Sequence, residues 1–556
     1  MSAINELSDR YVARATALDP IAATAIGIAG HDHELTDYSP EAESERATLD
    51  RATLRELDDV EIMSDRDRVA ADVLRERLDL GLALYDADEW LAALRVLGSP
   101  IQSIRQCFDL MAKATADDWV TITERLAVVP QALASFQATL TAGVERGIVA
   151  PRRQVEACTR QADAWGGVGD TPPYFLTLLE AFDVAGLDDP GPRRRLDELA
   201  GIATAAYAAT GRFLVEEYLP HATDRDAVGS ERYRLWGRAF NGIELDLEET
   251  YAWGWEELHR LERAMGQVAE RILPGAGVPA VIEHLENDPA RTIEGEDEFR
   301  AWLQELLDTT VAELNGVHFD IPEPVQRVEA MIAPPGGAAA MYYTGPSEDF
   351  SRPGRTWYPT LGRTSFPTWG EVSICYHEGV PGHHLQIGHV KHLGDALTRF
   401  QRTMAGCSGH AEGWALYAER LMGELGYLED PAYELGMLRA QVLRAVRVVV
   451  DLGMHLELEI PGSDRFHPGE TWTPELGLEF VLARSCFPAD FMRSEIDRYL
   501  GWPGQAISYK VGERVWLEAR DRVRRREGAG FDLKAFHRRA LDLGPLGLAQ
   551  LERELT

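Results

Sequence analysis

Residues 376–386 read YHEGVPGHHLQ, a near match to the zinc-hydrolase signature H-E-x-x-H. In that signature two histidines stand four residues apart on one helix, so both imidazoles reach the same Zn²⁺. Here Pro381 occupies the place of the second histidine. On an unbroken helix, His383 and His384 would lie about 9 Å and about 10 Å along the axis from His377, too far to share an ion with it.

The residues between these histidines change that conclusion. Pro381 removes a backbone donor and clashes with the preceding turn, while Gly379 and Gly382 allow backbone angles that other residues avoid. We therefore expect a helical bulge that returns a later histidine to the face of His377. Bulges of this kind often occur at functional sites.

Histidines are concentrated around this stretch. Six of the fifteen fall between residues 377 and 410, where an even spread would place about one. His389 and His392 lie in a polar helical segment, and we expect both to be solvated.

The composition bounds the class of protein. A chain of 556 residues exceeds the size of a single growing core, so we expect more than one lobe. Its 45% hydrophobic and 26% charged residues are those of a soluble globular protein, and a net charge of −35 disfavours a nucleic-acid partner. The N-terminal sequence lacks the pattern of a signal peptide, and no segment suits a membrane span. Five scattered cysteines indicate reduced thiols and a cytoplasmic location.

Hydrophobic periodicity predicts a mainly α fold. Helical patterns continue to about residue 315, and residues 322–372, rich in Pro, Gly, Tyr and Thr, predict a small sheet just before the histidines. Helices then resume to the C-terminus. We expect a helical lobe over residues 1–315 and a catalytic lobe over 316–556, together forming one catalytic unit.

Three motifs in order, HEGVPGHHLQ, HAEGWALYAERL and GQAISYKVGE, resemble a mostly bacterial family known as a domain of unknown function with an HExxPGHH motif. That family is grouped with the gluzincin-type zinc metallopeptidases. The resemblance runs from DPIAATAIGIAGHD near the start to SYKVGE near the end. It implies a two-lobed helical fold with a deep cleft and one zinc ion per chain.

The resemblance also implies roles for particular residues. His377 is the first ligand and Glu378 the general base. The second ligand is His383, since GHHL is similar to the GHxL of helical oligopeptidases, with His384 as the alternative. Glu412 on the next helix is the third ligand, with Glu419 as the alternative or as a supporting carboxylate. Related enzymes use a tyrosine from a late helix to stabilise the oxyanion, which corresponds here to Tyr509.

Further residues are candidates for holding a peptide substrate. An edge strand next to the active-site helix would pair with an extended peptide, and an arginine would bind its terminal carboxylate. The candidates for substrate binding are Tyr342, Tyr343, Arg352, Arg355, Arg493 and Lys510. Asp451 and His455, four residues apart on one helix, would form a supporting pair or an ordinary buried contact.

Three functions fit these patterns. The first is a zinc-dependent peptidase acting on short peptides by metal-activated water. The second is a metal-dependent hydrolase of another amide or ester, since the same ligands support any attack by activated water. The third is a peptide-binding protein that has lost the metal. Histidine and carboxylate ligands also suit manganese or cobalt, and the sequence does not predict the oligomeric state.

Overall fold

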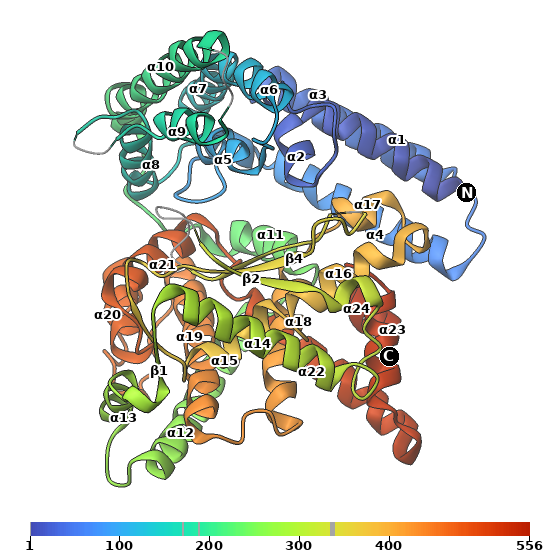
Figure 1. Cartoon of the computed structure of the whole chain (residues 1–556), viewed down its shortest axis with the longest axis vertical. Coiled ribbons are helices and arrows are strands. Elements are labelled where there is room, and N and C mark those ends of the chain that lie inside the picture. The colour runs from blue at the N-terminus through green and yellow to red at the C-terminus, as the bar shows by residue number, and fades with distance from the viewer. Residues whose placement is uncertain (1, 170–171, 187–189, 334–339, 348) are drawn as a thin grey trace. The chain divides into compact units, whose positions relative to one another are not determined.

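The computed structural model describes residues 2–169, 172–186, 190–333, 340–347 and 349–556 (Figure 1). These residues form two compact units, which are described separately. The first comprises Met1–Val228 and Leu500–Trp502, and the second comprises Gly229–Tyr499 and Pro503–Thr556. Within the described residues, no helix combines the length and apolar character needed to cross a bilayer.

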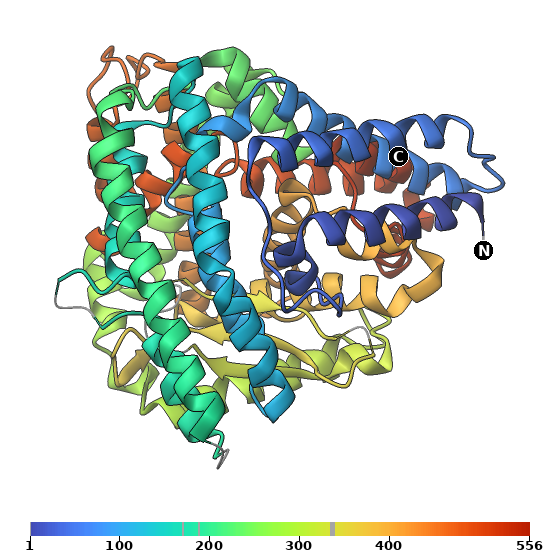
Figure 2. The same cartoon turned by 90° about the horizontal axis from the view of Figure 1, so that it is seen from above.

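The N-terminal unit is built from helices. Their bounds are α1 Ala3–Leu18, α2 Pro20–Ala25, α3 Pro40–Asp58, α4 Asp65–Asp86, α5 Pro100–Leu110, α6 Ala116–Ala127, α7 Val129–Arg146, α8 Arg152–Trp165, α9 Leu176–Val184 and α10 Pro190–Phe213. The alanine-rich α10 packs against α6, α7 and α8, and Figure 2 shows it running beside them. Phe108, Phe136, Phe175 and Tyr207 are buried in the core that these helices enclose.

The C-terminal unit holds the remaining helices and all the described strands. The bounds are α11 Gly229–Asn241, α12 Leu247–Ile272, α13 Val278–Glu286, β1 Thr292–Glu294, α14 Glu296–Leu314, β2 Val328–Ile332, β3 Tyr342–Thr344, β4 Gly354–Tyr358, β5 Ser365–Pro367, α15 Glu371–Glu378, α16 His383–Leu393, α17 Arg399–Thr403, α18 Ser408–Glu424, α19 Pro431–Leu456, α20 Pro474–Arg484, α21 Ala489–Gly501, α22 Ser508–Glu527, α23 Leu533–Asp542 and α24 Leu548–Leu555.

The division at Val228 differs from the boundary predicted near residue 315. Helices α11 to α14 belong to the C-terminal unit because α12 packs along the buried helix α19 (Figure 1). The two backbones approach closely at Gly254, where an added Cβ would lie 2.7 Å from Val448 Cγ1. Helical periodicity on both sides of residue 315 could not reveal which partner each helix packs against.

The predicted small sheet is confirmed. Strand β4 is central, parallel to β2 with Val328 opposite Gly354, and antiparallel to β3 with Tyr343 opposite Thr356. Strands β1 and β5 form a separate antiparallel pair. Residues 334–339 and 348 of the predicted sheet region lie outside the described residues. Helix α16, which carries His383 and His384, packs against β4.

Two glycines allow α18 and α22 to cross in close contact. A Cβ on Gly413 would lie 2.4 Å from the carbonyl carbon of Gly512, and a Cβ on Gly512 would lie 2.1 Å from the carbonyl oxygen of Gly409. No larger residue fits at either position without moving a helix. This crossing brings the HAEGWALYAERL motif on α18 beside the SYKVGE motif on α22.

Candidate metal centre

The YHEGVPGHHLQ stretch forms two helices with a break, where we had expected one bulged helix. Helix α15 ends at Glu378 and α16 begins at His383. The break folds tightly, since Gly382 N–H donates to the Tyr376 carbonyl at 3.0 Å and a Cβ on Gly382 would lie 2.0 Å from the His377 carbonyl oxygen. Trp414 Nε1 donates to the Pro381 carbonyl at 2.9 Å, which joins the break to α18. The glycine and the proline-containing turn thus bring a new helix start next to His377.

Three side chains meet at this break. Nε2 of His377 lies 3.5 Å and Nε2 of His383 lies 3.4 Å from the same oxygen, Oε2 of Glu412. The two imidazole rings stand nearly perpendicular, with centroids 4.8 Å apart. Side-chain exposure is 4% for His377, 12% for His383 and 21% for Glu412, so the cluster opens to solvent on the side of the last two.

These residues fit a zinc ion. Zinc bonds of about 2.0–2.1 Å in a tetrahedron place neighbouring ligand atoms roughly 3.4 Å apart, which agrees with both separations to the Glu412 oxygen. All three ligand atoms lie within 4.8 Å of one another. The Glu412 oxygen is buried and accepts no hydrogen bond in the described part of the chain. Two histidines and one carboxylate also leave a coordination position for water.

Glu419 supports His377 from behind. Its Oε1 accepts from His377 Nδ1 at 2.7 Å, and its Oε2 accepts from the Ser373 hydroxyl at 2.5 Å. The Arg444 guanidinium lies 3.5 Å from the same Oε1. Glu419 is fully buried and points its oxygens at Nδ1, so it orients the imidazole and leaves Nε2 for the cluster.

The electrostatics of the cluster follow from these contacts. Burial lowers the pKa of His377, but the carboxylates of Glu412 and Glu419 outweigh burial and raise that pKa to about 9. Burial raises the pKa of Glu412, whereas His377 and His383 hold it well below its usual range. The two carboxylates therefore concentrate negative charge where a cation would bind. Without a metal ion, the same charge favours the protonated form of His377.

His384 turns away from the cluster. Its Nε2 donates to the Val325 carbonyl at 2.7 Å, and its Nδ1 accepts from the Tyr343 hydroxyl at 2.9 Å. Burial lowers the pKa of His384 to about 4, which keeps the ring neutral. Both ring nitrogens are occupied, so His384 anchors α16 to the sheet region. The cluster is made with His383.

The prediction that His389 is solvated is wrong. His389 is 7% exposed, and its Nε2 lies 2.7 Å from Asp542 Oδ1 on α23. His389 faces α23, which packs on α16. The polar residues around His389 in the sequence suggested exposure and did not reveal this contact. His392 is exposed, as predicted.

Glu378 and Tyr509 remain available for chemistry. Glu378 is 7% exposed and follows the ligand candidate His377 directly. Tyr509 lies at the start of α22 and is half-buried. Among the described residues, neither the Glu378 carboxylate nor the Tyr509 hydroxyl has a hydrogen-bond partner. Burial and the negative charge of Glu412 raise the pKa of Tyr509 to about 12, so its hydroxyl stays protonated at neutral pH.

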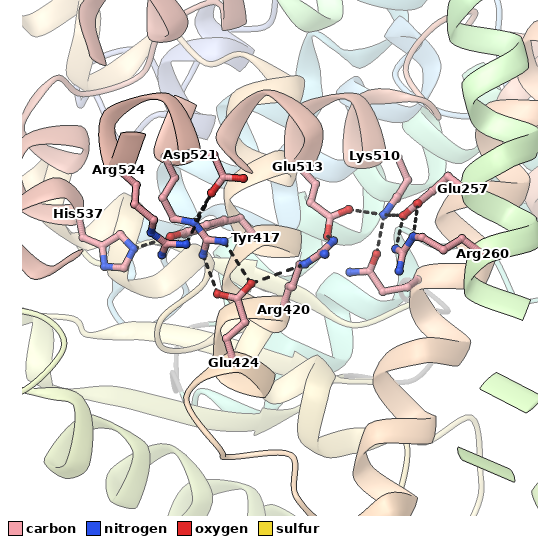
Figure 3. A network of polar contacts seen from close by, with 12 residues as sticks. Glu257, Arg260, Tyr417, Arg420, Glu424, Lys510, Glu513, Asp521, Arg524 and His537 are labelled. Atoms are coloured by element: carbon pink, nitrogen blue, oxygen red, sulfur yellow. Dashed lines mark hydrogen bonds and ion pairs between the residues drawn. The ribbon is translucent and has the colours of Figure 1, made fainter. Parts of the chain in front are cut away.

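Lys510, a predicted substrate-binding residue, is held in buried structural contacts. Its ammonium group is 1% exposed and donates to Gln441 at 2.8 Å, with ion pairs to Glu257 at 2.8 Å and to Glu513 (Figure 3). Adjacent helical residues point about 100° apart, so Lys510 faces Glu257 of α12 and Gln441 of α19, while Tyr509 packs against Arg444 and Arg447 of α19. Figure 3 shows Lys510 at one end of a polar network joining α12, α18 and α22.

The sheet region holds its candidate side chains in structural contacts. Arg355, predicted to bind a terminal carboxylate, pairs across the sheet with Glu329 at 3.0 Å. Tyr342 stacks on Trp357 with ring centroids 5.8 Å apart. The Tyr343 hydroxyl donates its hydrogen bond to His384 Nδ1.

The other two arginine candidates lie in separate places. Arg352 is half-buried, and its charge lowers the pKa of Tyr343 while burial raises it. Arg493 is exposed on α21. No described contact brings either arginine to the cluster.

Asp451 and His455 form a buried pair of contacts away from the candidate ligands. Asp451 Oδ2 accepts from the Tyr233 hydroxyl at 2.6 Å and from the Gly504 amide at 2.9 Å. His455 Nε2 donates to the Tyr499 carbonyl at 3.0 Å. The contact with Gly504 fixes the loop before α22. Asp451 and His455 thus make ordinary buried contacts, which is one of the two alternatives given for them above.

Sequence reasoning missed two residues near the cluster. Ser373 stands four residues before His377, on the same face of α15, and that spacing was a usable signal. Arg444 had no such signal, because a lone arginine in an apolar helix is usually at the surface. Its role depends on α18 packing beside α19.

Solved structures resemble the chain along its whole length. The "putative lipoprotein from Colwellia psychrerythraea" is 22% identical, with a TM-score of 0.84 over 100% of this chain and 99% of that chain. The "putative lipoprotein of unknown function from Shewanella oneidensis" is 16% identical, with a TM-score of 0.74 over 100% of this chain and 99% of that chain. These likenesses show a shared fold. No curated protein matches the chain. A family model described as "Bacterial protein of unknown function (DUF885)" matches residues 20–555, and the chain belongs to that family.

Proposed function

We propose that the protein is a zinc-dependent peptidase of the gluzincin type that cleaves short peptides. The observation that carries the proposal is the meeting of His377, His383 and Glu412 at separations that fit a tetrahedral ion. A buried carboxylate behind His377 supports it, because ligand histidines commonly donate their other nitrogen to such a group.

The chain's own residues supply the remaining chemistry. Bound zinc would polarise the scissile carbonyl and acidify water. Glu378 takes the proton from the attacking water and passes it to the leaving nitrogen. Tyr509, protonated at neutral pH, donates a hydrogen bond to the developing oxyanion. Strand β3 lies at an edge of the three-stranded sheet and offers main-chain groups to an extended peptide.

We also propose a cytoplasmic location, which accords with five free cysteines. The names of the two solved relatives point instead to lipid-anchored proteins. Fractionation of cells that express the native gene distinguishes the two, since a lipid anchor would place the protein with the membranes.

Adjacent histidines provide a matched test of the metal site. We expect gently purified protein to hold about one zinc per chain, His383→Ala to lose it, and His384→Ala to retain it if the fold survives. Circular dichroism reports the fold and mass spectrometry reports the metal. Equal metal content in the two variants would contradict the ligand assignment.

A second test addresses the reaction. Glu378→Gln should keep the zinc and lose peptide hydrolysis, since it removes only the proton acceptor. A library of short peptides provides substrates, and a parallel set of esters and non-peptide amides tests hydrolysis of other bonds. Peptide hydrolysis retained by Glu378→Gln would exclude Glu378 as the base.

A further inference from the structure

Two buried arginines flank Tyr509 on the helix that runs behind the candidate centre. Arg444 and Arg447 lie one turn apart on α19, and each is 7% exposed. The Arg447 guanidinium carbon lies 4.6 Å and that of Arg444 lies 5.9 Å from the centroid of the Tyr509 ring. Both cations therefore contact the residue proposed to stabilise the oxyanion.

These arginines keep unused hydrogen-bonding capacity. Arg447 donates from Nε to the Tyr499 hydroxyl at 2.9 Å and from Nη2 to Glu495 at 2.7 Å. Its second terminal nitrogen has no hydrogen bond among the described residues. Arg444 has only the 3.5 Å ion pair with Glu419, and its Nε is buried without a partner. Buried donors of this kind usually find an acceptor, so a missing ligand would explain them.

The arginines around Tyr509 share their carboxylate partners. Arg447 and Arg498 share one carboxylate, that of Glu495, which accepts from both. Arg444 shares Glu419 with His377. Among these direct contacts, three guanidinium groups share two carboxylates. Two guanidinium groups already hold a carboxylate here, and a second carboxylate would suit the remaining donors.

The arginines also lie close to the candidate ligands. Arg444 touches the carboxylate that holds His377, and the Glu412 charge acts on Tyr509 between the two arginines. A carboxylate bound by Arg444 and Arg447 would therefore lie near the reacting bond.

We propose that Arg444 and Arg447 together bind the C-terminal carboxylate of a short peptide. This inference rests on the proposed function and makes it more specific: the enzyme cleaves close to the free carboxyl end of its substrate. The sequence had suggested Arg352, Arg355 and Arg493 for substrate binding, and this inference assigns the carboxylate to Arg444 and Arg447 instead.

Equilibrium binding tests the inference without turnover. The probes are an N-dansylated alanine tripeptide with a free C-terminal carboxylate and the same peptide with a C-terminal amide. Fluorescence anisotropy gives the Kd of each for the Glu378→Gln protein. We expect the acid to bind about 10-fold to 100-fold more tightly than the amide, as expected when charge-assisted hydrogen bonds are lost.

Arginine variants show whether that preference comes from these residues. In the Glu378→Gln background, Arg444→Gln and Arg447→Lys should each reduce the acid-to-amide preference at least fivefold. Arg439→Gln is the matched control, because Arg439 is a half-buried arginine on the same helix that packs on Trp369 and Phe487. It should keep the preference. A ratio of two affinities is insensitive to partial unfolding, and Arg447→Lys keeps the charge beside Glu495.

The outcomes separate the two proposals. No preference for the acid, or a preference that both arginine variants retain, overturns the inference. Equal hydrolysis of acid and amide by the native zinc-loaded protein overturns it too, while peptidase activity stands. An arginine-dependent preference with no hydrolysis of either peptide supports the carboxylate site and overturns the proposed function.

Discussion

Replacing Glu419 by glutamine should weaken zinc binding while leaving every proposed ligand in place. Glu419 is fully buried and accepts from His377 Nδ1 at 2.7 Å. Glutamine keeps the size and an accepting oxygen, so His377 retains its hydrogen bond and loses the negative charge behind it.

The expected loss follows from that contact. A hydrogen bond to a charged group contributes about 1.5–3 kcal/mol, and a neutral one contributes about half as much. Removing the charge should therefore cost about 1–2 kcal/mol of metal-binding free energy, or roughly 5-fold to 30-fold in Kd. The nearby Arg444 also loses its counter-ion, which would destabilise the fold in addition.

Competition with a chromophoric chelator measures the zinc Kd, and urea unfolding of the metal-free protein separates stability from affinity. Glu424→Gln is the control, because Glu424 lies on the same helix and pairs with Arg520 at 2.7 Å. We expect that control to change the Kd by less than about twofold, because Glu424 contacts Arg420 and Arg520 rather than a proposed ligand. An unchanged Kd in Glu419→Gln would refute the supporting role of Glu419.

Three further predictions concern the framework of the C-terminal unit. Burial raises the pKa of Asp451 to about 7. As the pH rises, this carboxyl group therefore ionises in the unfolded chain before it ionises in the folded one, and the free energy of unfolding falls. Between pH 5.5 and 8.5 the wild type should lose about 2 kcal/mol of unfolding free energy that Asp451→Asn keeps, measured by urea titration. Lys510→Met removes the ammonium group between Glu257 and the buried Glu513, and leaves Glu513 with only the Arg420 guanidinium at 3.8 Å. It should cost about 3–5 kcal/mol of stability, with the KM for peptides unchanged, since structural contacts occupy the Lys510 side chain. Gly413→Ala places a Cβ 2.4 Å from the backbone of Gly512 and should lower the Tm by several degrees and weaken zinc binding; a Tm equal to that of wild type would contradict the close helix crossing.

Local sequence predicted much of the centre. The spacing of His377, Gly382 and His383 indicated a distorted helix, and the structure has a distorted region there, although as a break between two helices. Glu412 lies where the motif order placed it. The small sheet followed from composition alone, since Tyr, Thr and Pro disfavour a helix there.

What the sequence could not supply depends on side-chain direction and long-range packing. Lys510 follows Tyr509 in sequence, but its ammonium group contacts Glu257 and Gln441, whereas Tyr509 packs against Arg444 and Arg447. His384 likewise turns away from the cluster that His383 joins. Arg355 looked like a free arginine because its partner Glu329 lies on a neighbouring strand. The division at Val228 could not be predicted for the same reason, since α12 is far in sequence from the helix on which it packs.

Anomalous diffraction at the zinc absorption edge would locate a bound zinc ion and identify its ligands. Crystals grown with one equivalent of zinc should show one anomalous peak per chain, about 2.0–2.2 Å from Nε2 of His377, Nε2 of His383 and a carboxylate oxygen of Glu412. A strong peak elsewhere, or no peak at this cluster after soaking in excess zinc, would contradict the proposed zinc site of His377, His383 and Glu412.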